Sequence, residues 1–234
     1  MALVPFSHAS PFFNLRKLPE RLFTFQNKTI RIEQAWKDDG RGGTKLGFGA
    51  VVYDAAFVLA TYLEDHCINA LHSSNVLELG CGTGLVSIVA SLLGAKHVLA
   101  TDGDDEVVEL ATRNIKHALK DEKYATTCKA TKFLWGNDRE CKDIQNVTFD
   151  FIIAADVVAC PYASSFKSLL DSLERLVPVL SNTIILLAYQ KRHLSEQKLL
   201  EDIKKIFKVR YITQSHLAKD FQQHPIQLLE ISRS

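Results

Sequence analysis

The sequence lacks the cysteine patterns that mark metal sites and disulfide frameworks. Its five cysteines are odd in number and none forms a C-x-x-C pair, so neither a metal nor a disulfide-stapled fold is expected. The simplest interpretation is a reducing compartment. Excess charge is missing as well, because the formal net charge is +1. This balance argues against a partner held mainly by bulk electrostatics, such as nucleic acid or an anionic membrane.

Long hydrophobic runs are also missing. The longest apolar stretches, such as residues 183–189, are too short to cross a bilayer. No repeat, low-complexity tract or long linker divides the chain. Its 234 residues, of which 47% are hydrophobic and 24% charged, suit one large globular domain. We expect an N-terminal arm and strand over residues 1–45, a main domain over residues 46–234, and a monomer.

The first nineteen residues contain no acid and include serine and basic residues. This composition loosely fits an organelle transit peptide. The interpretation that we prefer is an irregular arm whose aromatic rings, Phe6, Phe12 and Phe13, pack on the domain. The expected location is therefore the cytoplasm, and also the nucleus, rather than an organelle.

Short apolar segments alternate with segments of helical periodicity along most of the chain. A strand is expected at residues 27–34, a polar glycine-rich loop at 37–49 and a helix at 53–65. Further strands are expected at 76–79, 97–101, 128–134, 149–155 and 183–189, and helices at 85–93, 105–120, 164–176 and 195–207. This order predicts an α/β fold, Rossmann-like and doubly wound, with a mostly parallel seven-stranded sheet. Two last strands, 209–213 and 226–231, follow without a helix between them, which predicts an antiparallel edge strand.

A glycine-rich loop follows the first buried strand of this alternating region. Gly80, Gly82 and Gly84 resemble the dinucleotide fingerprint G-x-G-x-x-G, but the third glycine comes one residue early. The loop still allows a ligand to press against backbone, because glycine has no Cβ. The spacing favours a nucleoside ligand without a pyrophosphate, and it disfavours a nicotinamide-dependent dehydrogenase.

Asp102 ends the next predicted strand, about twenty residues after the loop. An acid at the tip of this strand can accept hydrogen bonds from both hydroxyls of a ribose. The alternative interpretation is a turn or helix-capping residue, since Gly103, Asp104 and Asp105 follow it. The order of these elements favours ligand binding, because a strand, the glycines, a helix, a second strand and the acid follow one another at the expected spacing.

Several blocks of sequence occur in the order and spacing of one known family. They are Gly47-Phe48-Gly49-Ala50-Val51-Val52-Tyr53-Asp54-Ala55-Ala56, residues 76–85, Thr101-Asp102, Arg113-Asn114-Ile115, Leu134-Trp135-Gly136 and residues 149–158. From about Ile30 to the C-terminus, the chain resembles the seven-stranded S-adenosylmethionine-dependent methyltransferases. Within them it is most similar to the methyltransferase-16 family, which includes eukaryotic protein-lysine methyltransferases.

This resemblance implies S-adenosyl-L-methionine as the cofactor. The loop glycines would lie against its methionine and ribose portions, Glu78 would help to organise the amino-acid end, and Asp102 would hold the ribose. Trp135 would flank the adenine, where stacking contributes about 1–3 kcal/mol. The alternative for Trp135 is a core residue that ends a strand. The other residues expected to line the cofactor are Tyr53, Cys81, Thr83, Gly103 and Ala155.

Asp156 follows the predicted strand 149–155 and should share a rim with Asp102, because ligands bind at the carboxyl ends of parallel strands. An acid there is costly unless it faces the cleft. Methyl transfer from a sulfonium depends mostly on positioning, and an acceptor lysine must lose its proton despite a free pKa of about 10.4. Desolvation lowers that pKa, while a carboxylate orients the amine. Asp156 is therefore the candidate catalytic and substrate-binding residue; the alternative is a cap of the next helix.

The substrate side departs from the family pattern. Related lysine methyltransferases usually show D-x-x-Y after this strand, whereas residues 156–159 read D-V-V-A; Tyr162 would have to supply the aromatic ring. The family also usually has tryptophan at the position of Tyr53. Residues 189–193 lie on the same rim, where they either contact an acidic substrate surface or form a solvated strand end.

We therefore expect methylation of a lysine side chain in a protein. One alternative is a methyltransferase acting on a small molecule or nucleic acid, although the N-P-P-Y type motif of base methylation is missing. The other is a non-catalytic interaction module, against which the intact cofactor loop and Asp102 argue. Neither a nucleic acid nor a membrane is expected as a partner.

Overall fold

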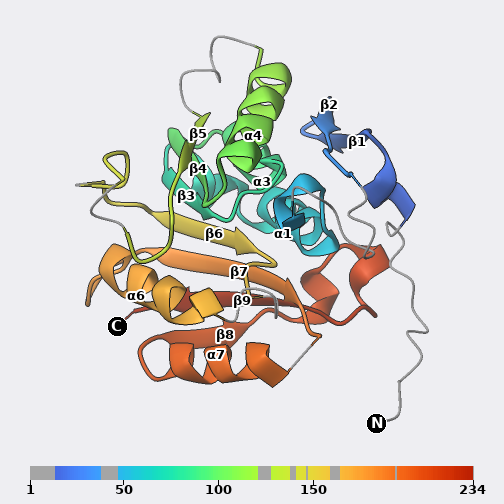
Figure 1. Cartoon of the computed structure of the whole chain (residues 1–234). Coiled ribbons are helices and arrows are strands. Elements are labelled where there is room, and N and C mark those ends of the chain that lie inside the picture. Colours follow the sequence, from blue (N-terminus) through green and yellow to red (C-terminus); the bar gives the residue numbers. More distant parts are fainter. Residues whose placement is uncertain are drawn as a thin grey trace.

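The computed structural model describes residues 14–37, 47–120, 128–137, 141–145, 147–158, 164–192 and 194–233. In this part of the chain, seven strands form one sheet in the order β5-β4-β3-β6-β7-β9-β8 (Figure 1). The strands are β3 (Asn75–Leu79), β4 (His97–Asp102), β5 (Cys128–Lys132), β6 (Phe151–Ala155), β7 (Ile184–Gln190), β8 (Lys208–Tyr211) and β9 (Ile226–Ser232). The predicted seven-stranded sheet is confirmed.

The direction of the strands follows from their connections. The neighbours from β5 to β7 pair in parallel, as expected for strands joined by helical crossovers. The last strand, β9, is antiparallel to both β7 and the edge strand β8, so the predicted antiparallel pairing at this edge is confirmed. Strand order reverses between β3 and β6, and ligands of such sheets bind outside the carboxyl ends at this point.

Helices cover both faces of the sheet, as Figure 1 shows, with α6 and α7 on one side and α1, α3 and α4 on the other. Their bounds are α1 (Asp54–His66), α2 (Ile68–Leu71), α3 (Leu85–Leu92), α4 (Asp105–Ala118), α6 (Phe166–Leu176) and α7 (Leu194–Lys204). In β3, Val76 belongs to the core beside α1 and α3, while Leu77 and Leu79 belong to the core beside α6. The side chain of Glu78 therefore points to the α3 face.

A β-hairpin precedes this sheet. It pairs β1 (Glu20–Phe25) with β2 (Lys28–Glu33), after the 3-10 turn η1 (Asn14–Lys17). Gln26 and Asn27 both have positive φ, as two-residue hairpin turns require. The sequence pattern predicts β2 but not β1, although the buried and exposed residues of β1 alternate. The buried rings and aliphatic side chains of the hairpin belong to the same core as α1.

Some predictions fall outside the described residues. They include the packing of Phe6, Phe12 and Phe13, the role of Tyr162, and most of the loop at 37–49, whose end forms the 3-10 turn η2 (Gly47–Ala50). Two further turns, η4 (Gln214–His216) and η5 (Lys219–Phe221), lie between β8 and β9.

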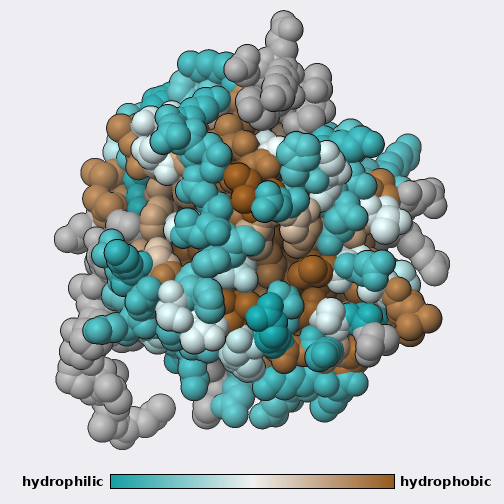
Figure 2. Space-filling model, turned by 180° about the vertical axis from the view of Figure 1, so that it is seen from behind, coloured by the Kyte–Doolittle hydropathy of each residue, from teal (hydrophilic) through white to brown (hydrophobic). Residues whose placement is uncertain are grey.

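The surface of the described residues carries little that points to a membrane or a metal. Figure 2 shows the reverse face as mostly hydrophilic, with apolar side chains visible near its centre. No helix that the structure describes combines the length and the apolar character needed to cross a bilayer. Within the same residues, no histidines, cysteines and acids gather as a set of metal ligands.

Candidate functional site

The glycine-rich loop leaves the carboxyl end of β3 and enters α3. Gly80, Gly82 and Gly84 all have positive φ, at +68°, +51° and +82°, a region that side chains with a Cβ avoid. The amide of Cys81 donates to the carbonyl of Thr101 over 2.8 Å. The loop is therefore tied to β4 and turns sharply at the switch point.

Three other segments approach these glycines. A Cβ on Gly80 would lie 2.6 Å from Cγ1 of Val157 and 3.7 Å from the ring of Trp135. A Cβ on Gly82 would lie 3.4 Å from the carbonyl oxygen of Gly49, in η2. Side chains thus approach Gly80 and backbone approaches Gly82, and because the glycines have no Cβ, a ligand can lie closely against their main-chain atoms.

Asp102 lies next to this loop at the end of β4. Its carboxylate accepts hydrogen bonds from the amides of Gly82, at 3.1 Å, and Asp104, at 3.4 Å. Burial raises the pKa of Asp102, and the backbone hydrogen bonds lower it in part. The neighbour Asp104 caps α4, accepting from Glu106 at 2.8 Å and Val107 at 3.3 Å. The capping role considered for Asp102 thus belongs to Asp104, whereas the bond from the Asp104 amide places Asp102 in the turn before α4; its ligand role stays a prediction.

Glu78 is fully buried beneath the loop. Its carboxylate accepts from the amide of Ser87, at 3.0 Å, and from the hydroxyl of the same residue. Burial raises its pKa to about 8, and the two Ser87 hydrogen bonds oppose this shift. The Glu78 carboxylate thus links the first turn of α3 to β3 and stabilises the conformation of the loop between them. Its predicted role in organising the amino-acid end of a cofactor would be indirect, through this loop.

Asn114 supports the same loop from α4, a role that the sequence analysis missed. Its side-chain amide donates to the carbonyls of Thr83, at 2.9 Å, and Glu33, at 3.0 Å, and its oxygen accepts from the amide of Glu33 at 2.8 Å. The only signal in the sequence was its place in the block Arg113-Asn114-Ile115. Cys81 and Thr83 are also buried, so they shape the loop from within.

Trp135, Gly103 and Leu134 lie on the β4–β5 side of the loop. Trp135 is half-buried near Gly80, and a Cβ on Gly103 would lie 3.4 Å from Cδ1 of Leu134. Leu134 is an apolar side chain that is 58% exposed at this rim, and the sequence analysis gave it no role. Ala155 ends β6 on the other side and is half-buried. These positions agree with the predicted cofactor lining, whose individual roles stay predictions.

Asp156 follows β6 and adopts a positive φ of +58°. Its Oδ1 accepts from the amide of Gln190 at 2.9 Å and from Nη1 of Arg192 at 3.1 Å, while Oδ2 accepts from Nη2 of Arg192 at 2.9 Å. The Asp156 and Arg192 side chains are 10% and 24% exposed. Arg192 was expected to face solvent or a substrate surface, whereas the structure shows it paired with Asp156.

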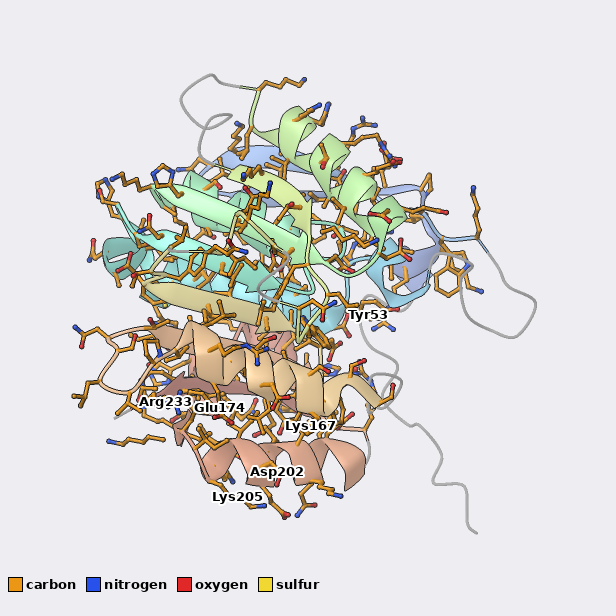
Figure 3. All side chains as sticks on the ribbon, turned by 60° about the vertical axis from the view of Figure 1, so that its left-hand side comes forward. Tyr53, Lys167, Glu174, Asp202, Lys205 and Arg233 are labelled. Carbon is orange, nitrogen blue, oxygen red and sulfur yellow. The ribbon has the colours of Figure 1, made fainter. Side chains whose placement is uncertain are left out.

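Tyr53 precedes α1 and lies near this ion pair. Burial raises the pKa of its phenol, the charge of Arg16 lowers it and that of Asp156 raises it. The Arg16 guanidinium lies over the Tyr53 ring at 4.8 Å from its centroid. In Figure 3, Tyr53 lies on the side of the molecule where α6 begins, whereas Glu174 lies toward the other end of this helix. Because the charges of Asp156 and Arg192 both affect the pKa of this phenol, Tyr53 lies close to the ion pair.

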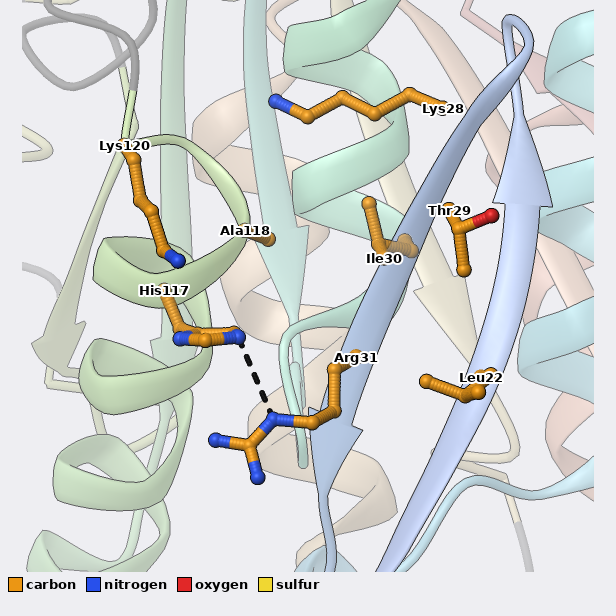
Figure 4. A pocket seen from close by; sticks show the side chains of 8 residues that line it. All are labelled: Leu22, Lys28, Thr29, Ile30, Arg31, His117, Ala118 and Lys120. Atoms are coloured by element: carbon orange, nitrogen blue, oxygen red, sulfur yellow. Dashed lines mark hydrogen bonds between the residues drawn. The ribbon is translucent and has the colours of Figure 1, made fainter.

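A separate hollow of about 410 Å³ lies between the hairpin and the C-terminal end of α4 (Figure 4). Arg31 and His117 form part of its wall, and Nε of Arg31 donates to Nε2 of His117 over 3.3 Å. None of the predicted site residues that the structure describes lines it. The described residues that line it are Leu22, Lys28, Thr29, Ile30, Arg31, His117, Ala118 and Lys120.

Comparison with known proteins finds similarity to methyltransferases over most of the chain. Residues 25–206 match a family described as lysine methyltransferase. The chain is 36% identical over 212 residues to protein N-lysine methyltransferase METTL21A of Xenopus tropicalis, covering 89% of each. It is 35% identical to the protein of the same name in Mus musculus over 211 residues, 89% of this chain and 88% of that one. Magnesium protoporphyrin IX methyltransferase from Synechocystis PCC 6803, solved with bound SAM, has a similar fold, with a TM-score of 0.51, 20% identity and coverage of 77% and 78%.

Proposed function

Because the chain belongs to the lysine methyltransferase family, we propose that it transfers the methyl group of S-adenosylmethionine to a lysine side chain of a protein. The observation that carries this proposal is the meeting of the positive-φ glycine loop, Asp102 and Asp156 at the switch point of the sheet. The related proteins are named protein N-lysine methyltransferases, which supports lysine as the acceptor.

S-adenosylmethionine supplies a methyl group that is bonded to a sulfonium sulfur. After the transfer, this sulfur belongs to a neutral thioether. Backbone of the loop from Gly80 to Gly84 would hold the methionine and ribose portions. The Asp102 carboxylate would accept from the ribose hydroxyls, because an anion attracts hydroxyl donors strongly. Trp135 and the exposed apolar Leu134 would border the adenine.

Asp156 would receive the acceptor amine on the opposite side of the methyl group. A carboxylate oxygen can accept an N–H of a neutral amine and so fix the direction of its lone pair. We further propose a monomer in the cytoplasm, and also in the nucleus. The net charge of +1 supports a protein substrate over a nucleic acid or a membrane.

Calorimetric titration with S-adenosylmethionine tests the cofactor site. Asp102→Ala should weaken binding about ten- to hundredfold, since hydrogen bonds to a charged group contribute roughly 1.5–3 kcal/mol. Asp104→Ala is the matched control; it removes the cap of α4 at a cost of about 1 kcal/mol of stability and should leave affinity nearly unchanged. Equal affinity of the Asp102 variant and the wild type would contradict the ribose role.

The acceptor is tested by incubating the protein with cell extract and methyl-labelled S-adenosylmethionine. The proposal expects a labelled protein band whose acid hydrolysate contains methyl-lysine. Asp156→Ala should bind the cofactor normally but label nothing. Label found in nucleic acid, in a small molecule or in another amino acid would overturn the lysine assignment. Cofactor binding without any labelling would indicate an interaction module.

A further inference from the structure

The ion pair between Asp156 and Arg192 joins two segments that are 36 residues apart. The guanidinium donates to both oxygens of the carboxylate, at 3.1 and 2.9 Å. Such two-point pairs are stronger and more directional than single contacts. The amide of Asp156 also donates to the carbonyl of Ala188 at 2.8 Å. The carboxylate is therefore fixed in place at the end of β6 despite its positive φ.

Arg192 is itself held on three sides. Its Nη2 donates to Oε1 of Gln190 at 2.9 Å, and its Nη1 to the carbonyl of Gln190 at 3.4 Å. Its backbone amide donates to a carboxylate oxygen of Glu196, in α7, at 2.7 Å. This arginine is consequently a fixed part of the rim rather than a mobile surface charge.

The hydrogen bonds leave one position open on Asp156. A carboxylate has about four lone-pair sites. Oδ1 accepts from Gln190 and Arg192, and Oδ2 accepts from Arg192. No other donor among the described residues reaches this carboxylate, so one lone pair of Oδ2 stays available for an N–H donor. The positive charge of Arg192 balances the negative charge of the carboxylate.

The balance of charge between Asp156 and Arg192 matters because the acceptor amine must react in its neutral form. An unpaired carboxylate within about 4–6 Å favours the ammonium and raises the pKa of the amine by about 1–3 units. A carboxylate already paired with arginine offers the same hydrogen-bond acceptor with much less of that penalty. On the basis of the proposed function, we infer that Arg192 is a positioning residue. It lets Asp156 orient the acceptor lysine without stabilising the protonated form of that lysine.

Few other charged groups of the described residues face this pair. Tyr53 approaches from the start of α1 with a phenol whose pKa is raised by burial, and Arg16 lies over its ring. Glu196 contacts the backbone of Arg192 from α7. The step itself needs no further reactant: the amine lone pair forms the N–C bond, the C–S bonding pair stays on sulfur, and the extra proton of the product passes to water.

Sinefungin, a cofactor analogue with an amine in place of the methyl-sulfonium group, tests the inference without a protein substrate. Its affinity is compared with that of S-adenosylhomocysteine, which has no group there, by calorimetry at pH 7. Arg192→Gln should increase the preference for sinefungin by up to about tenfold, because about one pKa unit in favour of the ammonium is at most a factor of ten when the wild type binds the neutral amine. Arg192→Lys should restore the wild-type ratio. Lys191→Gln, which removes an exposed charge from the same loop, is the matched control and should leave the ratio unchanged.

A second measurement uses the wild type alone and so does not depend on the folding of a variant. Calorimetry in buffers of different ionisation enthalpy should show that sinefungin releases a proton on binding, whereas S-adenosylhomocysteine does not. No release, or an equal change of both affinities in Arg192→Gln, would overturn the positioning role. Failure of the wild type to bind S-adenosylhomocysteine would instead refute the proposed function.

Discussion

Replacing Glu78 with glutamine should change how the stability of the protein depends on pH. Glu78 is fully buried, and its pKa is raised from 4.5 to about 8. In the unfolded chain the carboxyl ionises near 4.5, so between these values the folded state holds a proton that the unfolded state has lost. The contribution of Glu78 to stability is therefore complete below about pH 4.5 and is lost as the pH rises to about 8.

The size of this effect follows from the shift. A change from 4.5 to about 8 corresponds to roughly 5 kcal/mol, at about 1.4 kcal/mol for each pH unit. Glutamine is neutral throughout this range and keeps an oxygen that can accept from Ser87. The stability of Glu78→Gln relative to the wild type should therefore rise steadily from pH 5 to pH 8.5, by a few kcal/mol.

Urea unfolding followed by circular dichroism at several pH values between 5 and 8.5 measures this difference. Groups that do not interact with Glu78 titrate alike in the two proteins, so their contributions cancel. Glu106→Gln is the control, because Glu106 is exposed in the first turn of α4 and should change stability by less than about 1 kcal/mol at any pH. If the difference in stability between Glu78→Gln and the wild type does not change with pH, the conclusion that the buried Glu78 carboxyl is protonated would be refuted.

Three further substitutions test the walls of the cofactor site. Gly80→Ala should destabilise the protein by roughly 1–3 kcal/mol, because its Cβ would lie 2.6 Å from Val157; in thermal unfolding, Val157→Ala should recover part of this loss, and no recovery would exclude the clash. Asn114→Ala leaves buried groups of Thr83 and Glu33 without their hydrogen bonds and should cost roughly 2–4 kcal/mol in urea unfolding; a cost below about 1 kcal/mol would contradict this linking role. Trp135→Ala should weaken S-adenosylmethionine binding by about 1–3 kcal/mol in calorimetry while Trp135→Phe retains most of it, and an unchanged affinity would return Trp135 to a purely structural role.

The glycine-rich loop and the strands on either side of it were predictable because their signals are local. The loop glycines, the strand before them and Asp102 after the next strand follow one another within about thirty residues, and each reflects a backbone requirement or a strand end. Alternating strands and helices predicted the parallel part of the sheet for the same reason. The strand β1 was missed although its residues alternate, because the irregular arm was assigned to the first nineteen residues and no element was assigned between this arm and the strand expected at 27–34.

The choice between alternative roles needed the fold. The sequence alone does not assign different roles to Asp102, Asp104 and Asp105, because all three are aspartates in one short segment. The backbone geometry shows that Asp104 caps α4 while Asp102 accepts from the amide of Gly82. Likewise, nothing in the pattern around Asn114 indicates that its amide joins the hairpin to the loop. The direction in which each side chain points decides the roles of these aspartates and of Asn114. That direction depends on how the helices and strands pack together.

The sheet, the glycine-rich loop and the position of Asp156 at the end of β6 could all be inferred from the order of residues, because periodicity and glycine spacing act over a few residues. The pairing of Asp156 with Arg192 could be recognised only in the folded chain. Arg192 reaches Asp156 because β6 and β7 are neighbours in the sheet, a relation set by strand order and not by distance along the chain. The physical reason is that a charge pair depends on separation in space, which the order of residues does not record.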